Sequence, residues 1–163
     1  MKIKRMADRR EVINLKKNLY KTGPTVSGYL EAAAICTPSY LSFDYALSCH
    51  GLIPERAKIY TSATCRKRKK NLQELVRYIY QDIPLSVFPF EIEICYENER
   101  PFLMATPEKA VCDKLCTVKP IRSRKHLQQL LFDDLRTDQD AFSKLDFSVL
   151  RELCPLYKWT TFI

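Results

Sequence analysis

The 163-residue chain contains only three glycines, and it has no apolar run near the ~20 residues that a transmembrane helix needs. Its first residues alternate charged with apolar side chains and lack the apolar core of a signal peptide. It contains no phosphate-binding loop, dinucleotide-binding fingerprint or G-x-S-x-G motif. We therefore expect a cytoplasmic protein that does not associate with membranes and lacks the common nucleotide-binding and serine-hydrolase sites.

The seven cysteines form no C-x-x-C pair. Without a secretory signal they are expected to be reduced thiols. Cys112 and Cys116 lie four residues apart, and only His50 and His126 are available to add imidazole ligands. A zinc site from these residues stays open as an alternative, but the usual ligand spacing is missing. We expect most of the thiols to act as small buried apolar groups, with no metal and no cofactor.

Positive charge is in excess and unevenly distributed. The formal net charge is +8, and residues 1–21 alone hold eight Lys or Arg against two acidic residues. A second block, residues 66–70, consists of five consecutive cations. Such blocks attract phosphate backbones by counterion release, although an isolated run is also typical of a solvated loop. The candidate nucleic-acid or partner contacts are Arg9, Arg10, Lys16, Lys17, Arg66, Lys67, Arg68, Lys69 and Lys70.

The N-terminal half predicts a β-hairpin followed by two short helices. Residues 2–6 and 12–15 are the expected strands, and Asn18 is a candidate for positive φ because Asn tolerates that region. The helices are expected over residues 27–36 and 42–50. For the second helix, Ser42 is the expected N-cap, and Leu41 with Ala46 fits a hydrophobic staple. Gly51 and Leu52 fit a Schellman stop, after which Pro54 blocks continuation.

The middle of the chain predicts strands over residues 57–63, 75–80, 90–96 and 101–105, which in succession imply an antiparallel sheet. In 90–96 the alternation predicts a half-buried strand. Its apolar face is Phe90, Ile92, Ile94 and Tyr96, and its solvent face is Glu91, Glu93 and Cys95. Together with the helices, this gives an α+β class: a small antiparallel sheet packed with several helices and preceded by a wing-like hairpin.

The best-marked helix begins at Thr106, with Thr106 as N-cap, Pro107 at the first position and Glu108 in the first turn. We expect its apolar stripe to be buried, with Lys109 and Asp113 paired on the other side. The stripe consists of Val111, Cys112, Leu115 and Cys116. Further helices are expected over residues 122–134, with Leu127, Leu130 and Leu131 inward, and 146–153, ended by Pro155. The apolar tail 157–163 is expected to dock on the body.

Two segments, read together, resemble one family. The first is Pro38-Ser39-Tyr40-Leu41-Ser42 leading into Ala46-Leu47 and His50-Gly51-Leu52-Ile53-Pro54, and the second is Ala105-Thr106-Pro107-Glu108-Lys109-Ala110 with Asp113. In this order they are similar to the AbiEi antitoxin family of type IV toxin–antitoxin, or abortive-infection, systems. Residues 15–20 are similar to that family's Leu-x-x-Gly-x-Tyr wing pattern, with Asn18 in place of Gly. The resemblance covers residues 12–118. The structural motif residues are Ser39, Tyr40, Ser42, Ala46, Leu47, His50, Gly51, Pro54, Thr106, Pro107, Glu108, Lys109 and Asp113.

The resemblance implies a non-enzymatic antitoxin and transcriptional regulator of a bacterial phage-defence operon. Family members carry an N-terminal winged helix that represses their own promoter, and their C-terminal domain neutralises a nucleotidyltransferase toxin. Residues 1–22 would then be the wing-like remnant of a winged helix, and residues 23–163 the antitoxin domain. Since the resemblance begins inside the wing, we expect the DNA-reading helices to be missing from this sequence. It would then be either a fragment or short form, or an antitoxin domain without promoter binding. The basic surfaces are still expected to contact DNA or RNA phosphates, which orient a protein but carry no sequence information.

The alternative from another class is a metal-dependent nucleic-acid-processing enzyme. Its best carboxylates are Asp82, Glu91, Glu93 and Glu108, with Lys109 beside the last. Glu91 and Glu93 share one strand face, as metal-binding carboxylates sometimes do. Alternating glutamates are, however, the ordinary solvent face of a strand, and Glu108 suits a helix N-terminus. The structural interpretation of these acids is therefore favoured.

Overall fold

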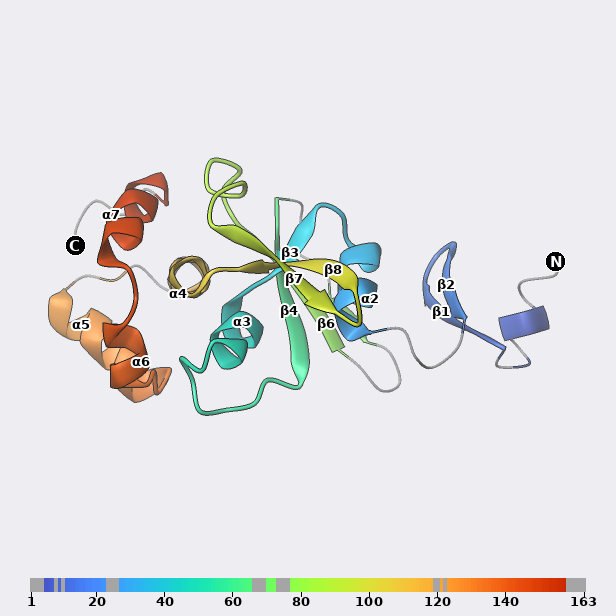
Figure 1. Ribbon diagram of the computed structural model, residues 1–163, viewed down its shortest axis with the longest axis horizontal. Helices are drawn as coiled ribbons and strands as arrows, with labels where there is room; N and C mark the ends of the chain where they lie inside the picture. Colours follow the sequence, from blue (N-terminus) through green and yellow to red (C-terminus); the bar gives the residue numbers. More distant parts are fainter. Residues whose placement is uncertain are drawn as a thin grey trace.

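The chain is extended, with a hairpin at one end, a sheet in the middle and a helical layer at the other end (Figure 1). This computed structural model describes residues 5–7, 9, 11–22, 27–65, 70–72, 77–118, 121 and 123–157. The strands are β1 (Val12–Lys16), β2 (Leu19–Thr22), β3 (Ser39–Leu41), β4 (Ile59–Thr64), β5 (Lys70–Leu72), β6 (Arg77–Asp82), β7 (Ile92–Glu97) and β8 (Arg100–Ala105). The helices are α2 (Gly28–Ile35), α3 (Phe43–Cys49), α4 (Pro107–Cys116), α5 (Arg124–Gln128), the π-helix η1 (Gln129–Asp134), α6 (Gln139–Ser143) and α7 (Phe147–Leu156).

The central sheet has six strands in the order β5-β6-β4-β3-β8-β7. The predicted α+β class and the N-terminal hairpin are confirmed. The sheet is mixed, however, because β4 pairs with β6 and β3 pairs with β8 in parallel, whereas the other neighbours are antiparallel. Parallel neighbours need a connection of about a dozen residues or more, and the segment between β4 and β6 has that length.

The hairpin pairs other segments than the predicted 2–6 and 12–15. It joins β1 to β2 through a turn at Lys17 and Asn18. Asn18 has a positive φ, as predicted, with a value of 66°. Residues 5–7 are helical, so a strand over 2–6 is wrong; residues 2–4 lie outside the described part of the chain. Because Asn tolerates left-handed backbone, the chain reverses within two residues and β1 pairs with the segment that follows it.

The hairpin is docked on α2. The Lys16 Nζ donates a hydrogen bond to the Ile35 carbonyl at 2.7 Å, and the Lys21 Nζ lies 2.6 Å from the buried Glu31 carboxylate. Val12 and Leu15 of β1 are buried. A two-stranded hairpin is not stable by itself in water, so these contacts with α2 account for its position.

Helix α3 ends as the sequence predicts. Gly51 has a φ of 69°, the Leu52 N–H donates to the Leu47 carbonyl at 2.8 Å, and the Gly51 N–H donates to the Ser48 carbonyl at 3.2 Å. These are the two bonds of a Schellman motif. Ser42 occupies the predicted N-cap position, but its side chain makes no capping bond. Its hydroxyl instead donates to the Asp113 carboxylate in the core.

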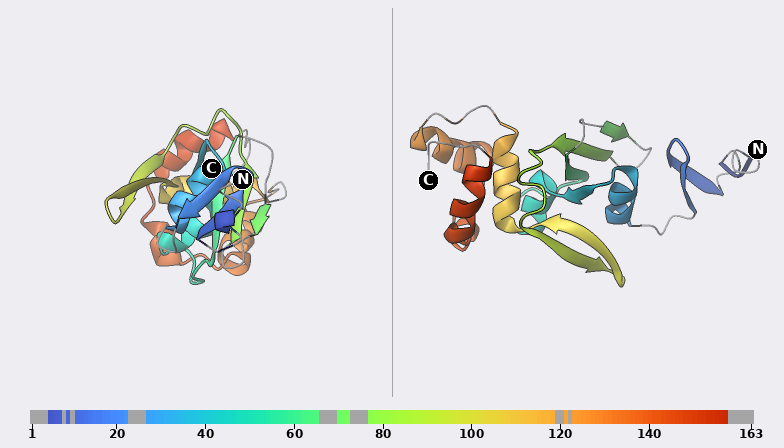
Figure 2. Two further views of the ribbon diagram at one scale, coloured as in Figure 1. Left: turned by 90° about the vertical axis from the view of Figure 1, so that its right-hand side faces the viewer. Right: turned by 90° about the horizontal axis from the view of Figure 1, so that it is seen from above.

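The inward face predicted for β7 is wrong. Phe90, Ile94 and Tyr96 are exposed, and Ile92 is half-buried. Figure 2 shows the reason: the β7–β8 hairpin projects from the body, so the sheet is covered on only one side there. Phe102, opposite Cys95, instead faces the body and stacks on Tyr29 of α2 at a centroid distance of 4.4 Å.

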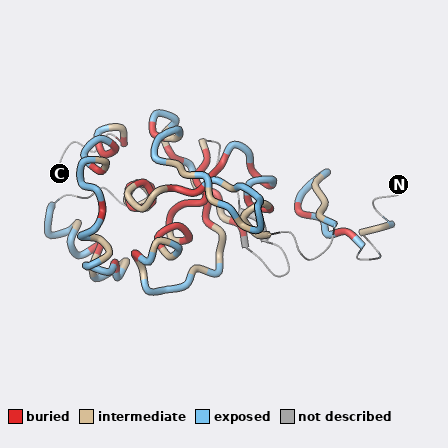
Figure 3. Tube along the Cα trace, in the orientation of Figure 1, coloured by how far each residue is buried: buried red, intermediate tan, exposed pale blue. Residues whose placement is uncertain are grey.

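The core runs from the centre of the sheet into α3 and α4 (Figure 3). α4 packs between α3 and α7, and its predicted start at Thr106–Pro107 is confirmed. The predicted helix over 122–134 is present as α5 followed by η1, with Leu130 and Leu131 buried as predicted. α7 continues one residue past Pro155 to Leu156, beyond its predicted end. Tyr157 is buried, and the rest of the predicted docking tail, 158–163, lies outside the described residues.

A substitution series at Gly51 isolates the cost of its backbone conformation. A Cβ atom built at Gly51 meets no atom within 4 Å, so any loss comes from the positive φ and not from a clash. We expect Gly51→Val to lower the free energy of unfolding by about 1–2 kcal/mol and Gly51→Asn to cost clearly less, since Asn tolerates this region. Urea unfolding measures both, and equal losses for the two variants would contradict the assignment.

Candidate functional site

A fully buried polar cluster surrounds Asp113 of α4. The Asp113 Oδ2 accepts hydrogen bonds from the Tyr40 hydroxyl at 2.9 Å and the Ser42 hydroxyl at 2.7 Å. The Oδ1 accepts a hydrogen bond from the Tyr157 hydroxyl and lies 3.6 Å from the Lys109 Nζ. One carboxylate thus connects β3, the start of α3, α4 and the residue after α7.

Lys109 is the cation of this cluster and is also completely buried. Its Nζ donates to the Val87 carbonyl at 2.6 Å and lies 4.9 Å from the centre of the Tyr157 ring and 5.9 Å from that of Tyr40. The predicted pairing of Lys109 with Asp113 is confirmed. Their expected place outside the buried stripe is wrong, because α4 is covered on that side by β3, the loop at Val87 and Tyr157.

Burial and pairing act against each other on the two charges. Burial raises the pKa of Asp113, while Lys109 and the three hydroxyl donors oppose that rise. Burial also lowers the pKa of Lys109, and Asp113 opposes that fall. Burial together with the Asp113 charge raises the pKa of the Tyr40 and Tyr157 hydroxyls, so both stay protonated as donors. The contacts are those of an ion pair that its hydrogen bonds hold in place.

The two motif segments meet at this cluster and beside it. The His50 Nε2 lies 2.8 Å from the Ala105 carbonyl oxygen, which joins the end of α3 to the residue before Thr106. The Thr106 hydroxyl accepts the Lys109 N–H at 3.3 Å, and the Glu108 carboxylate accepts the Asp146 N–H at 2.8 Å. The remaining motif positions also serve the fold: Ser39, Ala46 and Leu47 are buried, and Pro54 is exposed after the turn.

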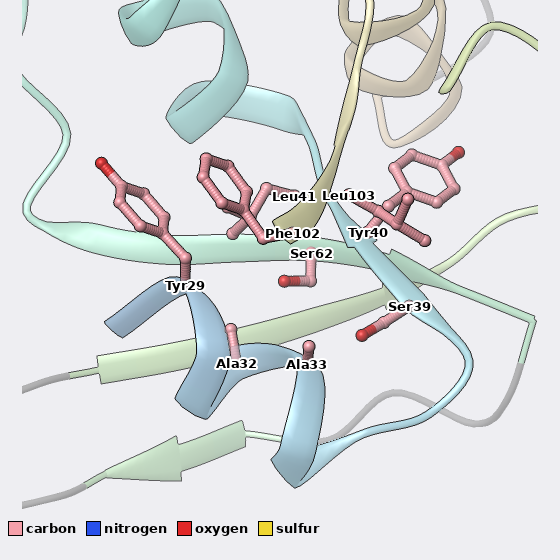
Figure 4. A pocket seen from close by; sticks show the side chains of 9 residues that line it. All are labelled: Tyr29, Ala32, Ala33, Ser39, Tyr40, Leu41, Ser62, Phe102 and Leu103. Carbon is pink, nitrogen blue, oxygen red and sulfur yellow. The ribbon is translucent and has the colours of Figure 1, made fainter. Parts of the chain in front are cut away.

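A shallow hollow lies on the other side of Tyr40, between α2 and the strands β3, β4 and β8 (Figure 4). Its cavity volume is only about 10 Å³, so it has room for no more than about one water molecule. The Ser39 hydroxyl beside it already donates to the Cys36 carbonyl at 2.5 Å. Its lining is mostly apolar and aromatic and carries no charged group: Tyr29, Ala32, Ala33, Ser39, Tyr40, Leu41, Ser62, Phe102 and Leu103.

The predicted cationic contacts are only partly described. Arg9 is highly exposed and lies 3.9 Å from Glu11, and Lys17 is exposed in the hairpin turn. The Lys16 ammonium is occupied by the last carbonyls of α2, which gives it a structural function. Arg10 and Arg66, Lys67, Arg68 and Lys69 lie outside the described residues, and Lys70 is placed only by its backbone in β5.

The carboxylates of the alternative enzyme interpretation have separate surroundings. Asp82 and Glu91 are exposed, and Glu93 lies 3.8 Å from the His50 Nε2. Glu108 binds the start of α7. Within the part of the chain that the structure describes, no three His, Cys, Asp or Glu side chains are grouped so that they could hold a metal ion. Cys112 is buried, whereas His126 is exposed on α5.

Tyr157 and the Val87 carbonyl were not anticipated from the sequence. An aromatic residue in an apolar C-terminal stretch gives a weak signal for burial, but nothing local connects Tyr157 to a carboxylate 44 residues earlier. The Val87 carbonyl has no sequence signal, because every residue carries one.

No protein-family model matches the chain, and a search of curated proteins finds no significant match. None of the helices in the described ranges combines the length and apolar character that crossing a bilayer requires.

Breaking the buried pair tests its energetics. We expect Lys109→Met to lower the free energy of unfolding by about 3–5 kcal/mol, because Asp113 stays buried without its cation. The double variant Lys109→Met/Asp113→Leu is expected to lose about 1–3 kcal/mol less than the two single variants added together. Urea unfolding measures all three.

The matched control is Lys114→Met on the same helix. It removes a pair at 2.6 Å with Asp44, a partly exposed carboxylate. Such pairs contribute at most about 1 kcal/mol. Strict additivity at Lys109 and Asp113, or equal losses for Lys109→Met and Lys114→Met, would contradict the inferred coupling.

Proposed function

We propose that this chain is an antitoxin and regulatory domain of a bacterial toxin–antitoxin or abortive-infection system, which counteracts a nucleotidyltransferase toxin in the cytoplasm. The observation that carries the proposal is the meeting of two sequence segments. Both resemble the AbiEi antitoxins, and in this fold they share one buried cluster.

The contacts between the segments are specific. Tyr40 and Ser42 from the first segment both donate to Asp113 from the second, across 73 and 71 residues of sequence. His50 from the first segment binds the carbonyl of Ala105 at the beginning of the second. Two segments that resembled the family only by chance would not be expected to contact each other in the fold. The hydrogen bonds between them support the interpretation that both belong to one family-like domain.

The proposed action is through surfaces, without covalent chemistry. Every polar group of the Asp113 cluster is already engaged with another group of the core, and the cluster is fully buried. A partner is therefore met by the outside of the domain, where Arg9 and Lys17 are exposed. Cationic surfaces of this kind give electrostatic complementarity to phosphates or to an acidic protein surface.

Co-expression tests the antitoxin proposal directly. The adjacent reading frame is expected to encode a nucleotidyltransferase whose induction arrests growth. Co-expression of this chain should restore growth, because the chain neutralises the toxin. Colony counts at matched induction measure the rescue, and a frameshifted copy of the chain is the control. Continued arrest in the presence of the folded chain would refute the proposal.

Neutralising the five cations at 66–70 tests the basic-surface contact. We expect Arg66, Lys67, Arg68, Lys69 and Lys70 changed to Gln to weaken duplex DNA binding and to lower the salt slope by about 0.9 for each lost phosphate contact. A control variant changes the exposed Arg56, Lys58, Arg100, Lys144 and Arg151 to Gln and so removes the same charge elsewhere. Fluorescence anisotropy against salt concentration measures both; identical slopes would show that only net charge matters.

A further inference from the structure

The β7–β8 hairpin presents an apolar face that the body does not cover. Ile94, Tyr96 and Leu103 are 60%, 69% and 44% exposed. The register pairs Ile94 with Leu103 and Tyr96 with Pro101, so these four residues share one face. We call them the hairpin patch. A contiguous apolar patch on a projecting element is a feature of interaction sites.

The backbone of β7 is available as well. β7 is the last strand of the six-stranded sheet, and no strand among the described residues pairs with its outer side (Figure 2). The hairpin is nevertheless well anchored, because Phe102 on its other face stacks on Tyr29 and Met104 is buried. An ordered edge strand with free N–H and C=O groups is a template for adding one more strand.

The charge of the hairpin indicates what kind of polypeptide strand could pair with the free edge of β7. Within residues 90–105 the charged residues are four glutamates and one arginine, a net charge of −3 in a chain whose total is +8. Glu93 and Glu97 lie on the face opposite the hairpin patch, which is also the face of Phe102. Glu93 is half-buried, and the Glu97 Oε2 is buried without a hydrogen-bond partner among the described residues. Phosphate backbones and anionic lipid surfaces are repelled by such a strand, whereas a basic polypeptide is attracted.

A second copy of the same strand fits poorly. In an antiparallel pair across a two-fold axis, centring on Ile94 sets Glu91 opposite Glu97, and centring on Cys95 sets Glu93 opposite Glu97. Centring on Ile92, Glu93 or Tyr96 likewise opposes two glutamates. Like charges directly opposite each other destabilise a strand pair, so self-pairing of β7 is disfavoured in the registers centred on Glu93 or Cys95, where the opposed glutamates lie within the strand.

We propose that β7 binds an extended segment of a partner protein in which Lys or Arg alternates with apolar residues. The segment adds to the sheet as a seventh strand. Its apolar side chains pack on the hairpin patch, and its cations lie on the face of Glu93 and Glu97. Main-chain hydrogen bonds supply affinity and the alternating side chains supply specificity. This surface does not depend on the antitoxin proposal, so either can fail alone.

Peptide binding to the full chain tests the inference. The probe is a fluorescein-labelled ten-residue peptide in which Lys alternates with Val. One comparison peptide alternates Glu with Val, and another keeps the Lys–Val composition but groups all the lysines in one half. We expect the alternating basic peptide to bind at least about tenfold more tightly than either comparison, because only it places cations and apolar groups on opposite faces. Hydrogen exchange should show protection of the β7 amides on binding.

Variants of the chain locate the site. Ile94→Lys is expected to weaken binding of the basic peptide about tenfold, because it places a cation in the hairpin patch. Glu93→Gln/Glu97→Gln should weaken it severalfold and flatten its salt dependence. Leu85→Lys is the control, since Leu85 is 73% exposed but lies outside the hairpin. Thermal unfolding checks that each variant keeps its fold.

Several results would overturn the proposal. One is equal affinity for the three peptides; another is binding that Ile94→Lys leaves unchanged, or protection confined to amides outside β7. Sedimentation of the chain alone gives the remaining check. Self-association that Ile94→Lys abolishes would identify a second copy as the occupant and reject a basic partner segment.

Discussion

The Asp113 carboxylate holds together parts of the chain that are distant in sequence. Its two oxygens receive hydroxyl donors from β3, from the start of α3 and from the residue after α7. A hydrogen bond to a charged acceptor contributes about 1.5–3 kcal/mol, and leaving such an acceptor unsatisfied in the core costs more. The hydrogen bonds to this one side chain therefore help to fix the helical layer against the sheet, together with the apolar core that the two share.

Lys109 offsets the energetic cost of burying the Asp113 carboxylate. Removing a carboxylate from water costs several kcal/mol even after relaxation, and a cation at 3.6 Å offsets much of this cost. The cation is itself satisfied by the Val87 carbonyl and by the faces of two tyrosine rings. A buried pair of this kind fixes orientation more than it adds net stability. Here it orients α4, against which α3 and α7 pack.

Local signals made part of this structure predictable. The Schellman end at Gly51, the positive φ of Asn18 and the Thr106–Pro107 start of α4 each follow from the conformational preferences of a few neighbouring residues. Features set by distant parts of the chain were not predictable. The burial of Lys109 depends on Val87 and Tyr157, and the diversion of the Ser42 hydroxyl from its capping function depends on Asp113. The exposed apolar face of β7 has the sequence pattern of a buried face. Alternation shows that a strand has two different faces, but it does not show which of them the body covers.

The apolar face of β7, which the sequence pattern predicts to be buried, is also the surface on which the proposed partner contact rests. In an ordinary edge strand, an apolar face that the fold leaves uncovered is an aggregation hazard, and glutamates along that strand are a common safeguard. In β7 the apolar residues and the glutamates occupy opposite faces of one strand, so the safeguard acts against copies of the same chain while leaving the backbone edge open to a basic segment. The polar groups around Asp113 are already hydrogen-bonded to one another or to the Val87 carbonyl. The proposed partner contact therefore rests on the outside, where an acidic, apolar edge lies on a chain that is basic as a whole.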